Sequence, residues 1–182
     1  MIDLTKKALP NTVTVGGKAF SINTDYRVWL RFVTEFEKWD KKGSMDISYL
    51  FPLGQPFFRE KSDYNDIFEF AYPKNIVPRG EPSTEKIYDY MIDSDYIYSA
   101  FMQQYGIDLL SVDMHWHQFC ALFNGISEGT RFHEIMGYRS YTGGKIKSQD
   151  EIYRKLKYAW EIPIEETEEE IMAEQEFNDY FG

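Results

Sequence analysis

Residues 93–139 read DSDYIYSAFMQQYGIDLLSVDMHWHQFCALFNGISEGTRFHEIMGYR, and this stretch decides the fold. Its apolar side chains recur every three or four residues, as on one face of a helix. At Gly106 the pattern indicates a left-handed helix end, with Ile107 folding back on Met102. The stretch predicts three short helices, which run from Asp93 or Ser94 to Tyr105, from about Asp113 to Asn124, and from a cap at Thr130 to Gly137.

The N-terminal part predicts a hairpin followed by a helix. Residues 12–22, TVTVGGKAFSI, alternate in polarity around a Gly-Gly pair that suits a two-residue turn with positive φ. The turn fixes the expected cross-strand pairs, which are Val13 with Phe20 and Val15 with Lys18. The helix is expected from about Asp25 to Lys41, with a cap at Thr24, a stop at Gly43 and an outward Arg31–Glu35 pair.

Two further helices and a loop complete the predicted elements. A short helix is expected over residues 63–71, ended by Pro73, and residues 73–86 form an exposed loop rich in Pro and Gly. Ser148 to Glu151 match the S-x-x-E capping box, which predicts a helix that begins there. Its inward residues are expected to be Ile152, Leu156, Ala159 and Trp160.

Charge divides the chain into a neutral body and an acidic tail. The chain carries 30 acidic and 20 basic residues, and nine acids but no bases lie from Glu161 onward. We therefore predict two parts: a compact, mainly α-helical domain with a short N-terminal β-hairpin (residues 1–160) and an acidic, flexible tail (residues 161–182). The tail either keeps an aromatic-rich protein in solution, or folds on a partner or shields a sticky surface until that partner arrives.

Composition also limits the classes of partner. A near-neutral body lacks the basic footprint of nucleic-acid binding, and an acidic tail repels phosphates and membranes. The N-terminal sequence lacks the apolar run of a signal peptide, and no eighteen-residue apolar run predicts a membrane span. Aromatic residues make up 18% of the chain, which favours either a Tyr-rich core or surface rings that contact a partner.

The histidines are the first candidates for chemistry. Residues two apart on a helix point about 200° apart, so His115 and His117 cannot chelate one ion from the same helix. His117 is expected to point outward, and His115 to be a hydrogen-bonded residue at the rim of the core. His117 and Cys120 lack a second close pair that would complete a zinc site. Cys120 lies on the apolar stripe, where a thiol is usually inert.

No other catalytic device is recognisable. Asp93, Asp95, Asp108 and Asp113 stand where helix caps are expected. The chain has neither a G-x-S-x-G elbow nor a phosphate-binding glycine loop, and the basic residues at 145–157 read as a solvated helix face. We therefore predict a protein that is not an enzyme and binds no cofactor or metal. A small hydrolase using Asp or His is a distant alternative.

Three ordered sub-motifs in the central stretch carry a family resemblance. YIYSAFMQQYGIDL (96–109), MHWHQFCALFNGI (114–126) and TRFHEIMGYR (130–139) resemble the gene-product-fifteen family of tailed phages and prophages of Gram-positive bacteria. Two features depart from the family pattern. His117 stands where a second aromatic residue is expected, and residues 52–86 look unlike the family's more helical middle.

The resemblance implies a tail assembly chaperone. Such a protein would bind the long, hydrophobic tape-measure protein in the host bacterial cytoplasm until tail tube subunits polymerise around it, and it would be absent from the mature virion. A second chaperone and the major tail tube protein are further implied partners, and a homo-oligomer is left open. The alternative is a structural virion protein of the tail or its adaptor region.

The central stretch also supplies the expected partner-binding residues. Binding of apolar helical segments needs aromatic-lined grooves between helices and adaptable methionines such as Met102, Met114 and Met136. Trp116 is expected to lie mostly in the core. The predicted partner-binding residues are Phe101, Tyr105, Ile107, His115, Trp116, Phe119, Phe132, Met136 and Arg139.

Overall fold

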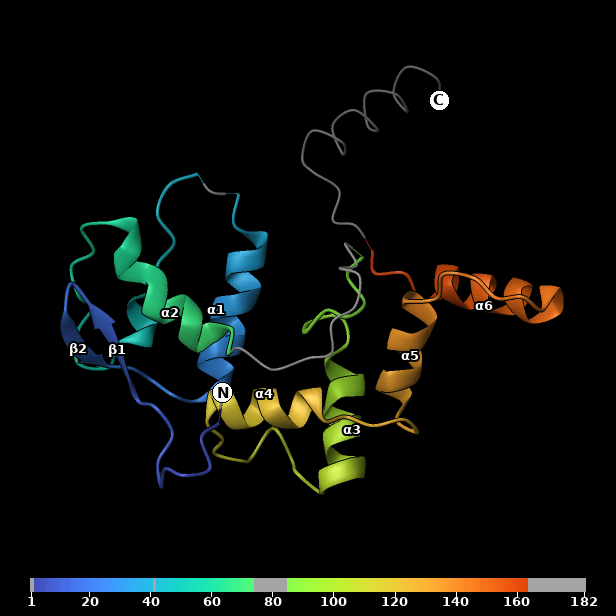
Figure 1. The fold of residues 1–182 in the computed structure, drawn as a ribbon, viewed down its shortest axis with the longest axis horizontal. Coiled ribbons are helices and arrows are strands. Elements are labelled where there is room, and N and C mark those ends of the chain that lie inside the picture. The colour runs from blue at the N-terminus through green and yellow to red at the C-terminus, as the bar shows by residue number, and fades with distance from the viewer. Residues whose placement is uncertain (1, 41, 74–84, 164–182) are drawn as a thin grey trace, which may run out of the picture.

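The computed structural model describes residues 2–40, 42–73 and 85–163 and confirms a mainly α-helical fold with an N-terminal hairpin (Figure 1). Most of the predicted loop at 73–86 and of the predicted tail lies outside these residues. The elements are β1 (Thr12–Val15), β2 (Lys18–Ser21), α1 (Tyr26–Lys38), η1 (Ser48–Leu50), η2 (Lys61–Tyr64), α2 (Asn65–Ala71), α3 (Ser94–Tyr105), α4 (Trp116–Asn124), α5 (Arg131–Arg139) and α6 (Lys147–Ala159). None of the described helices is long and apolar enough to cross a bilayer.

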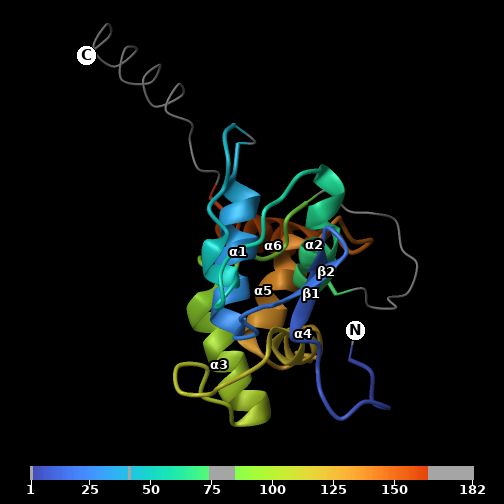
Figure 2. The same cartoon turned by 90° about the vertical axis from the view of Figure 1, so that its left-hand side faces the viewer.

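The hairpin forms with the predicted register. Val13 pairs with Phe20 and Val15 with Lys18, and Gly16 and Gly17 both have positive φ, as the two-residue turn requires. Figures 1 and 2 both place the hairpin beside α2. Carboxylates bind the outer edge of β1, because Thr14 N donates to Asp66 at 2.9 Å and Gly16 N donates to Asp63 at 3.1 Å. The hairpin is thereby fixed to the η2–α2 unit.

The first helix begins and ends slightly inside its predicted bounds. Asp25, and not Thr24, caps α1, because its side chain accepts from Arg27 N at 2.8 Å. At the other end Trp39 takes an extended conformation, so the helix stops at Lys38. Trp29, Phe32 and Val33 on its inner face are buried, and the predicted Arg31–Glu35 pair is present on the outer face.

Helix α3 ends at the predicted residue. The side chains of its last turn bind backbone groups at the end of α4 and just after it. Gly106 lies at φ 65°, and its N–H donates to Met102 O at 3.1 Å, which is the hydrogen bond of a left-handed (αL) helix end; Ile107 N donates to Phe101 O and not to Met102 O, so the expected Schellman bond is absent. The Gln104 side chain binds Gly125 O and Ser127 N, and Tyr105 Oη donates to Leu122 O at 2.8 Å. A Cβ at Gly125 would lie 3.0 Å from Tyr105 Oη, so a larger residue at this position would require the tyrosine to shift.

Helix α4 begins later than predicted because its start pairs with the start of α1. Asp25 and His115 form an isolated antiparallel bridge, in which Trp116 N donates to Thr24 O at 2.8 Å and Tyr26 N to Met114 O at 3.0 Å. His115, and not Asp113, caps the helix through its side chain. The starts of α1 and α4, which are far apart in sequence, are thus connected by backbone hydrogen bonds.

The last two helices differ from prediction at their ends. Thr130 caps α5 as expected, but the helix continues through Gly137 to Arg139, because Gly137 has no left-handed conformation. Helix α6 begins at Lys147, so Ser148 lies inside it and forms no capping box. Two of the four predicted inward residues are wrong, since Ile152 and Ala159 are exposed, whereas Leu156 and Trp160 are partly buried; no side chain of α6 is fully buried. The sequence of α6 is amphipathic, but no other part of the described chain fully covers its apolar face.

A buried ion pair joins α3 to α5. The Asp93 side chain is 1% exposed and the Arg139 side chain 6% exposed, and two hydrogen bonds of 2.6 and 3.0 Å connect them. Arg139 also donates to Trp160 O at 2.6 Å and to Ile87 O at 3.2 Å, while Asp93 accepts from Asp89 N. Asp93 was predicted to be a helix cap. It precedes α3, but its carboxylate caps no helical amide and serves the ion pair instead.

Arg139→Met should strongly destabilise the fold. The substitution leaves the Asp93 carboxylate buried without its partner, which typically costs about 3–5 kcal/mol. Urea unfolding followed by circular dichroism measures the loss. Lys155→Met, which removes an exposed ion pair with Glu151, is the matched control and should change the free energy of unfolding by less than about 1 kcal/mol. Equal effects of the two variants would contradict the structural role of the buried pair.

Candidate functional site

The predicted partner-binding residues lie mainly in the core. None of the nine is exposed. Tyr105, Ile107, His115 and Met136 are partly buried, and Phe101, Trp116, Phe119, Phe132 and Arg139 are buried. Met114 is also buried, whereas Met102 is exposed. The buried residues hold the helices together and do not present their side chains to a partner in this conformation.

Phe119 is the centre of this aromatic core. Its ring stacks on Tyr26 at 4.9 Å, on Phe101 at 5.3 Å and on Trp116 at 5.6 Å between centroids. Stacked pairs of this kind add roughly 0.5–1.5 kcal/mol beyond the area they bury. Phe119 therefore joins α1, α3 and α4 in one stack, and the expectation that Trp116 belongs to the core agrees with its 2% exposure.

The tripeptide His115–Trp116–His117 binds three backbone carbonyls of other elements. Trp116 Nε1 donates to Ala71 O at 2.9 Å, and the Nε2 atoms of His115 and His117 lie 2.9 and 3.0 Å from Pro10 O and Phe70 O. Phe70 and Ala71 are the last residues of α2, whose terminal carbonyls have no partner within their own helix. Trp116 and His117 therefore cap α2, and His115 fixes the segment before the hairpin through Pro10 O.

His117 points inward, which corrects the prediction that it faces solvent. His117 is the second residue of α4, and α2 lies against this first turn. The His117 ring therefore stacks on Phe70 at 4.4 Å and is 5% exposed. His117 thereby presents a flat ring to Phe70 and adds a hydrogen bond to Phe70 O.

Hydrogen bonding fixes His115 in the neutral state, and burial favours the neutral state of His117. His115 Nδ1 accepts from His117 N at 3.0 Å, so its Nε2 carries the proton that is donated to Pro10 O. His117 Nε2 donates to Phe70 O, while its Nδ1 is buried and has no partner among the described residues. Burial lowers the pKa of His117 to about 4, and burial also lowers the pKa of His115.

Cys120 is a weak candidate for a nucleophile. It is partly buried on α4, and burial raises the pKa of its thiol to about 12. Because the thiolate is the reactive species, this environment disfavours attack. Within residues 2–40, 42–73 and 85–163, no three His, Cys, Asp or Glu side chains come together as a metal site.

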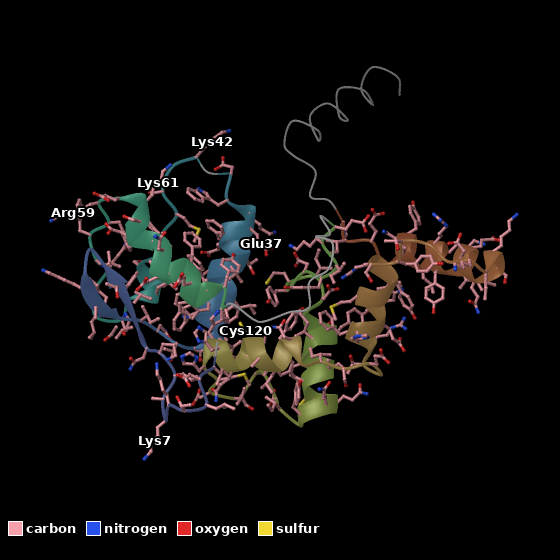
Figure 3. The ribbon with its side chains drawn as sticks, in the orientation of Figure 1. Lys7, Glu37, Lys42, Arg59, Lys61 and Cys120 are labelled. Atoms are coloured by element: carbon pink, nitrogen blue, oxygen red, sulfur yellow. The ribbon has the colours of Figure 1, made fainter. Side chains whose placement is uncertain are left out.

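Cys120 instead lines an aromatic pocket of about 190 Å³, which lies between α1, α2 and α4. In Figure 3 the labelled Cys120 lies between α4 and α1. Tyr88 and Tyr90 form one wall, with rings 5.1 and 5.2 Å from Phe123, and Tyr72 at the rim is 45% exposed. These tyrosines are not among the predicted partner-binding residues, although the aromatic alternation in KIYDYMI (86–92) is a visible signal.

A second, larger hollow of about 520 Å³, which we call the polar hollow, is lined mostly by charged residues, and Arg139 of the buried ion pair is one of them. Its charged side chains neutralise one another. Lys86 binds Glu37 at 2.7 Å and Asp89 at 2.8 Å, and Lys157 binds Glu85 at 2.6 Å. Figure 3 shows Glu37 on the side of α1 that faces α3 and α5. This paired lining offers no concentrated charge of one sign to an ionic ligand.

His117→Gln should remove part of the acid sensitivity of the fold. Between pH 6.5 and about 4 the unfolded chain binds a proton at His117 that the folded chain excludes, so stability is highest above pH 6.5 and falls as pH decreases. A shift of this size corresponds to at most about 3 kcal/mol. Urea unfolding at several pH values should show a flatter pH profile for His117→Gln. His133→Gln is the control, and an unchanged profile in both variants would refute the assignment.

Comparison with known proteins identifies the family. A model of the family described as bacteriophage Gp15 protein matches residues 59–162, which is more than half of the 182-residue chain. The curated proteins contain no match, and neither do the solved structures. The matched range runs from the start of η2 through α6, and includes the Trp116–His117 cap and the buried Asp93–Arg139 pair. This chain belongs to the bacteriophage Gp15 protein family.

Proposed function

We propose that this protein is a tail assembly chaperone that binds the tape-measure protein of a tailed phage. Membership of the bacteriophage Gp15 family, which points to a phage structural or assembly protein, carries the proposal. All residues that line the aromatic pocket, apart from Val33 and Glu37 on α1, lie within the matched range. The part of the chain that matches the family therefore forms most of the wall of this surface hollow.

The size of the aromatic pocket supports binding of one side chain at a time. A hollow of about 190 Å³ is smaller than the 300–1,000 Å³ typical of small-molecule sites. It suits a Leu, Met or Phe that projects from an amphipathic helix, with the exposed Tyr72 at the rim as an aromatic anchor. A single anchor of this kind gives modest affinity. Repeated anchors along a long helical partner would add avidity and still permit displacement.

The proposal carries the rest of the functional assignment with it. The protein would act without catalysis, cofactor or metal in the cytoplasm of a Gram-positive host during virion assembly. A second chaperone and the major tail tube protein are proposed as further partners, while nucleic acid and membranes are not. The weak reactivity of Cys120 and the mutual pairing of charges in the polar hollow are in keeping with a binding role.

Tyr72→Ala should reduce binding of the tape-measure protein. The variant removes the exposed ring at the pocket rim, and loss of an aromatic anchor typically costs about 2 kcal/mol or more in binding, roughly a thirtyfold loss of affinity. Co-expression with the tape-measure protein, followed by affinity capture and quantification of its soluble fraction, measures the effect. Phe57→Ala removes another exposed ring that does not line the pocket, and it should retain binding. Loss in both variants or in neither would place the site elsewhere.

Purified virions should lack this protein. A chaperone is released when tube subunits replace it, whereas a structural tail protein remains at a fixed number of copies per particle. Quantitative mass spectrometry of purified particles, with the major tail tube protein as internal standard, separates the two. A stoichiometric amount in virions would replace the chaperone proposal with the structural one.

A further inference from the structure

The aromatic pocket and the polar hollow share a wall on α1. The second half of this helix lines the aromatic pocket through Val33 and Glu37, and it lines the polar hollow through Thr34, Glu37 and Lys38. Glu37 therefore borders both spaces. The two hollows are neighbours along the same face of α1.

They also share a second wall, which is the segment of residues 85–92 that leads into α3 (Figure 1). Tyr88 and Tyr90 of this segment line the aromatic pocket, while Lys86 and Asp89 line the polar hollow. Two hollows with two common walls are parts of one groove, which runs between α1 and residues 85–92.

An ion pair crosses this groove from one wall to the other. Lys86 Nζ donates to Glu37 Oε2 on α1 at 2.7 Å, and we call this pair the crossbar. The same ammonium donates to Asp89 within its own segment at 2.8 Å. The side chains of Lys86 and Glu37 are 47% and 44% exposed. Ion pairs this exposed to water contribute little free energy, so the crossbar opens easily.

The backbone beside Lys86 is held without the crossbar. Ile87 O accepts from Arg139 at 3.2 Å, and Asp89 N donates to the Asp93 carboxylate at 2.9 Å. Both bonds lead to the buried ion pair. The Lys86 side chain can therefore leave Glu37 while the tyrosine wall stays in place, and its bond to Asp89 is kept.

We propose that the crossbar is a gate between the two hollows. When it is closed, the aromatic pocket of about 190 Å³ is separate from the polar hollow of about 520 Å³. When it opens, the two join into one groove. The gate regulates the site of the proposed function and rests on that function for its occupant, an amphipathic helix of the tape-measure protein.

The open groove offers this helix a second contact. The closed pocket accommodates one apolar side chain. Ile92, 48% exposed, lines the polar hollow on the far side of the crossbar, where it can contact another apolar side chain of the same helix. Because opening the gate precedes this second contact, the stability of the crossbar limits the affinity for the helix.

The gate is tested in the free protein through Cys120, which is the only cysteine of the chain and lines the aromatic pocket. Its rate of modification is measured with N-phenylmaleimide and with the smaller N-methylmaleimide. Both reagents are uncharged, and the ratio of the two rates cancels any change in the pKa of the thiol. Glu37→Gln and Lys86→Met each remove the crossbar and change the local charge in opposite directions.

The ratio of the bulky to the small reagent should rise in both variants, by up to about fivefold. Glu151→Gln, which removes an exposed ion pair with Lys155 on α6, is the matched control and should keep the wild-type ratio. A rise that is absent from either gate variant, or that is equal in the control, would overturn the proposal.

A second measurement connects the gate to binding. Glu37→Gln and Lys86→Met should bind the tape-measure protein up to about fivefold more tightly than wild type and Glu151→Gln do. Equal affinities of all four proteins would overturn the regulatory role of the crossbar. Absence of binding by wild type would contradict the proposed function, whereas the maleimide ratio, measured without tape-measure protein, would still decide whether the gate exists.

Discussion

The ion pair between Asp93 and Arg139 is the contact on which the C-terminal half of the structure depends. It joins the start of α3 to the end of α5, and the remaining donors of Arg139 bind Ile87 O and Trp160 O. Four segments thus meet at one guanidinium. Two charges removed from water in this way stabilise a fold only when nearly every donor and acceptor is satisfied, and here backbone groups complete the arrangement. Asp93 and Arg139 are the first and last residues of the central stretch (93–139), so their ion pair holds the two ends of this stretch together.

The family sub-motifs are largely explained by folding. Trp116 and His117 cap α2, and Gln104 and Tyr105 bind backbone groups at the end of α4 and just after it. Buried carbonyls without partners are costly, so residues that satisfy several of them are strongly constrained. The motif consequently identifies the scaffold, while the surface that the proposed function needs lies beside it, at Tyr72, Tyr88 and Tyr90.

Structure was predicted correctly where it depends on neighbouring residues, and incorrectly where it depends on residues far away in the sequence. The hairpin register follows from Gly16–Gly17, and the end of α3 follows from Gly106, because both rest on backbone geometry of a few residues. The inward position of His117 depends on α2, 47 residues away, and the role of Asp93 depends on an arginine 46 residues later. At Ser148 the local capping signal predicted the wrong helix start, because α6 begins at Lys147 and Ser148 lies inside the helix. The predicted partner-binding residues are buried or partly buried, because aromatic spacing indicates burial as readily as contact.

The attachment of α6 has a consequence for how the molecule opens. Regions with few buried apolar contacts and solvent-facing backbone hydrogen bonds unfold locally at low free energy, without global unfolding. Helix α6 has no buried side chain and is held by Tyr141, Tyr153 and the bond from Arg139 to Trp160 O. Its amide protons should exchange with solvent well before those of α4, whose inner face is buried in the aromatic stack. The helix is therefore placed to detach while the core of the protein stays folded.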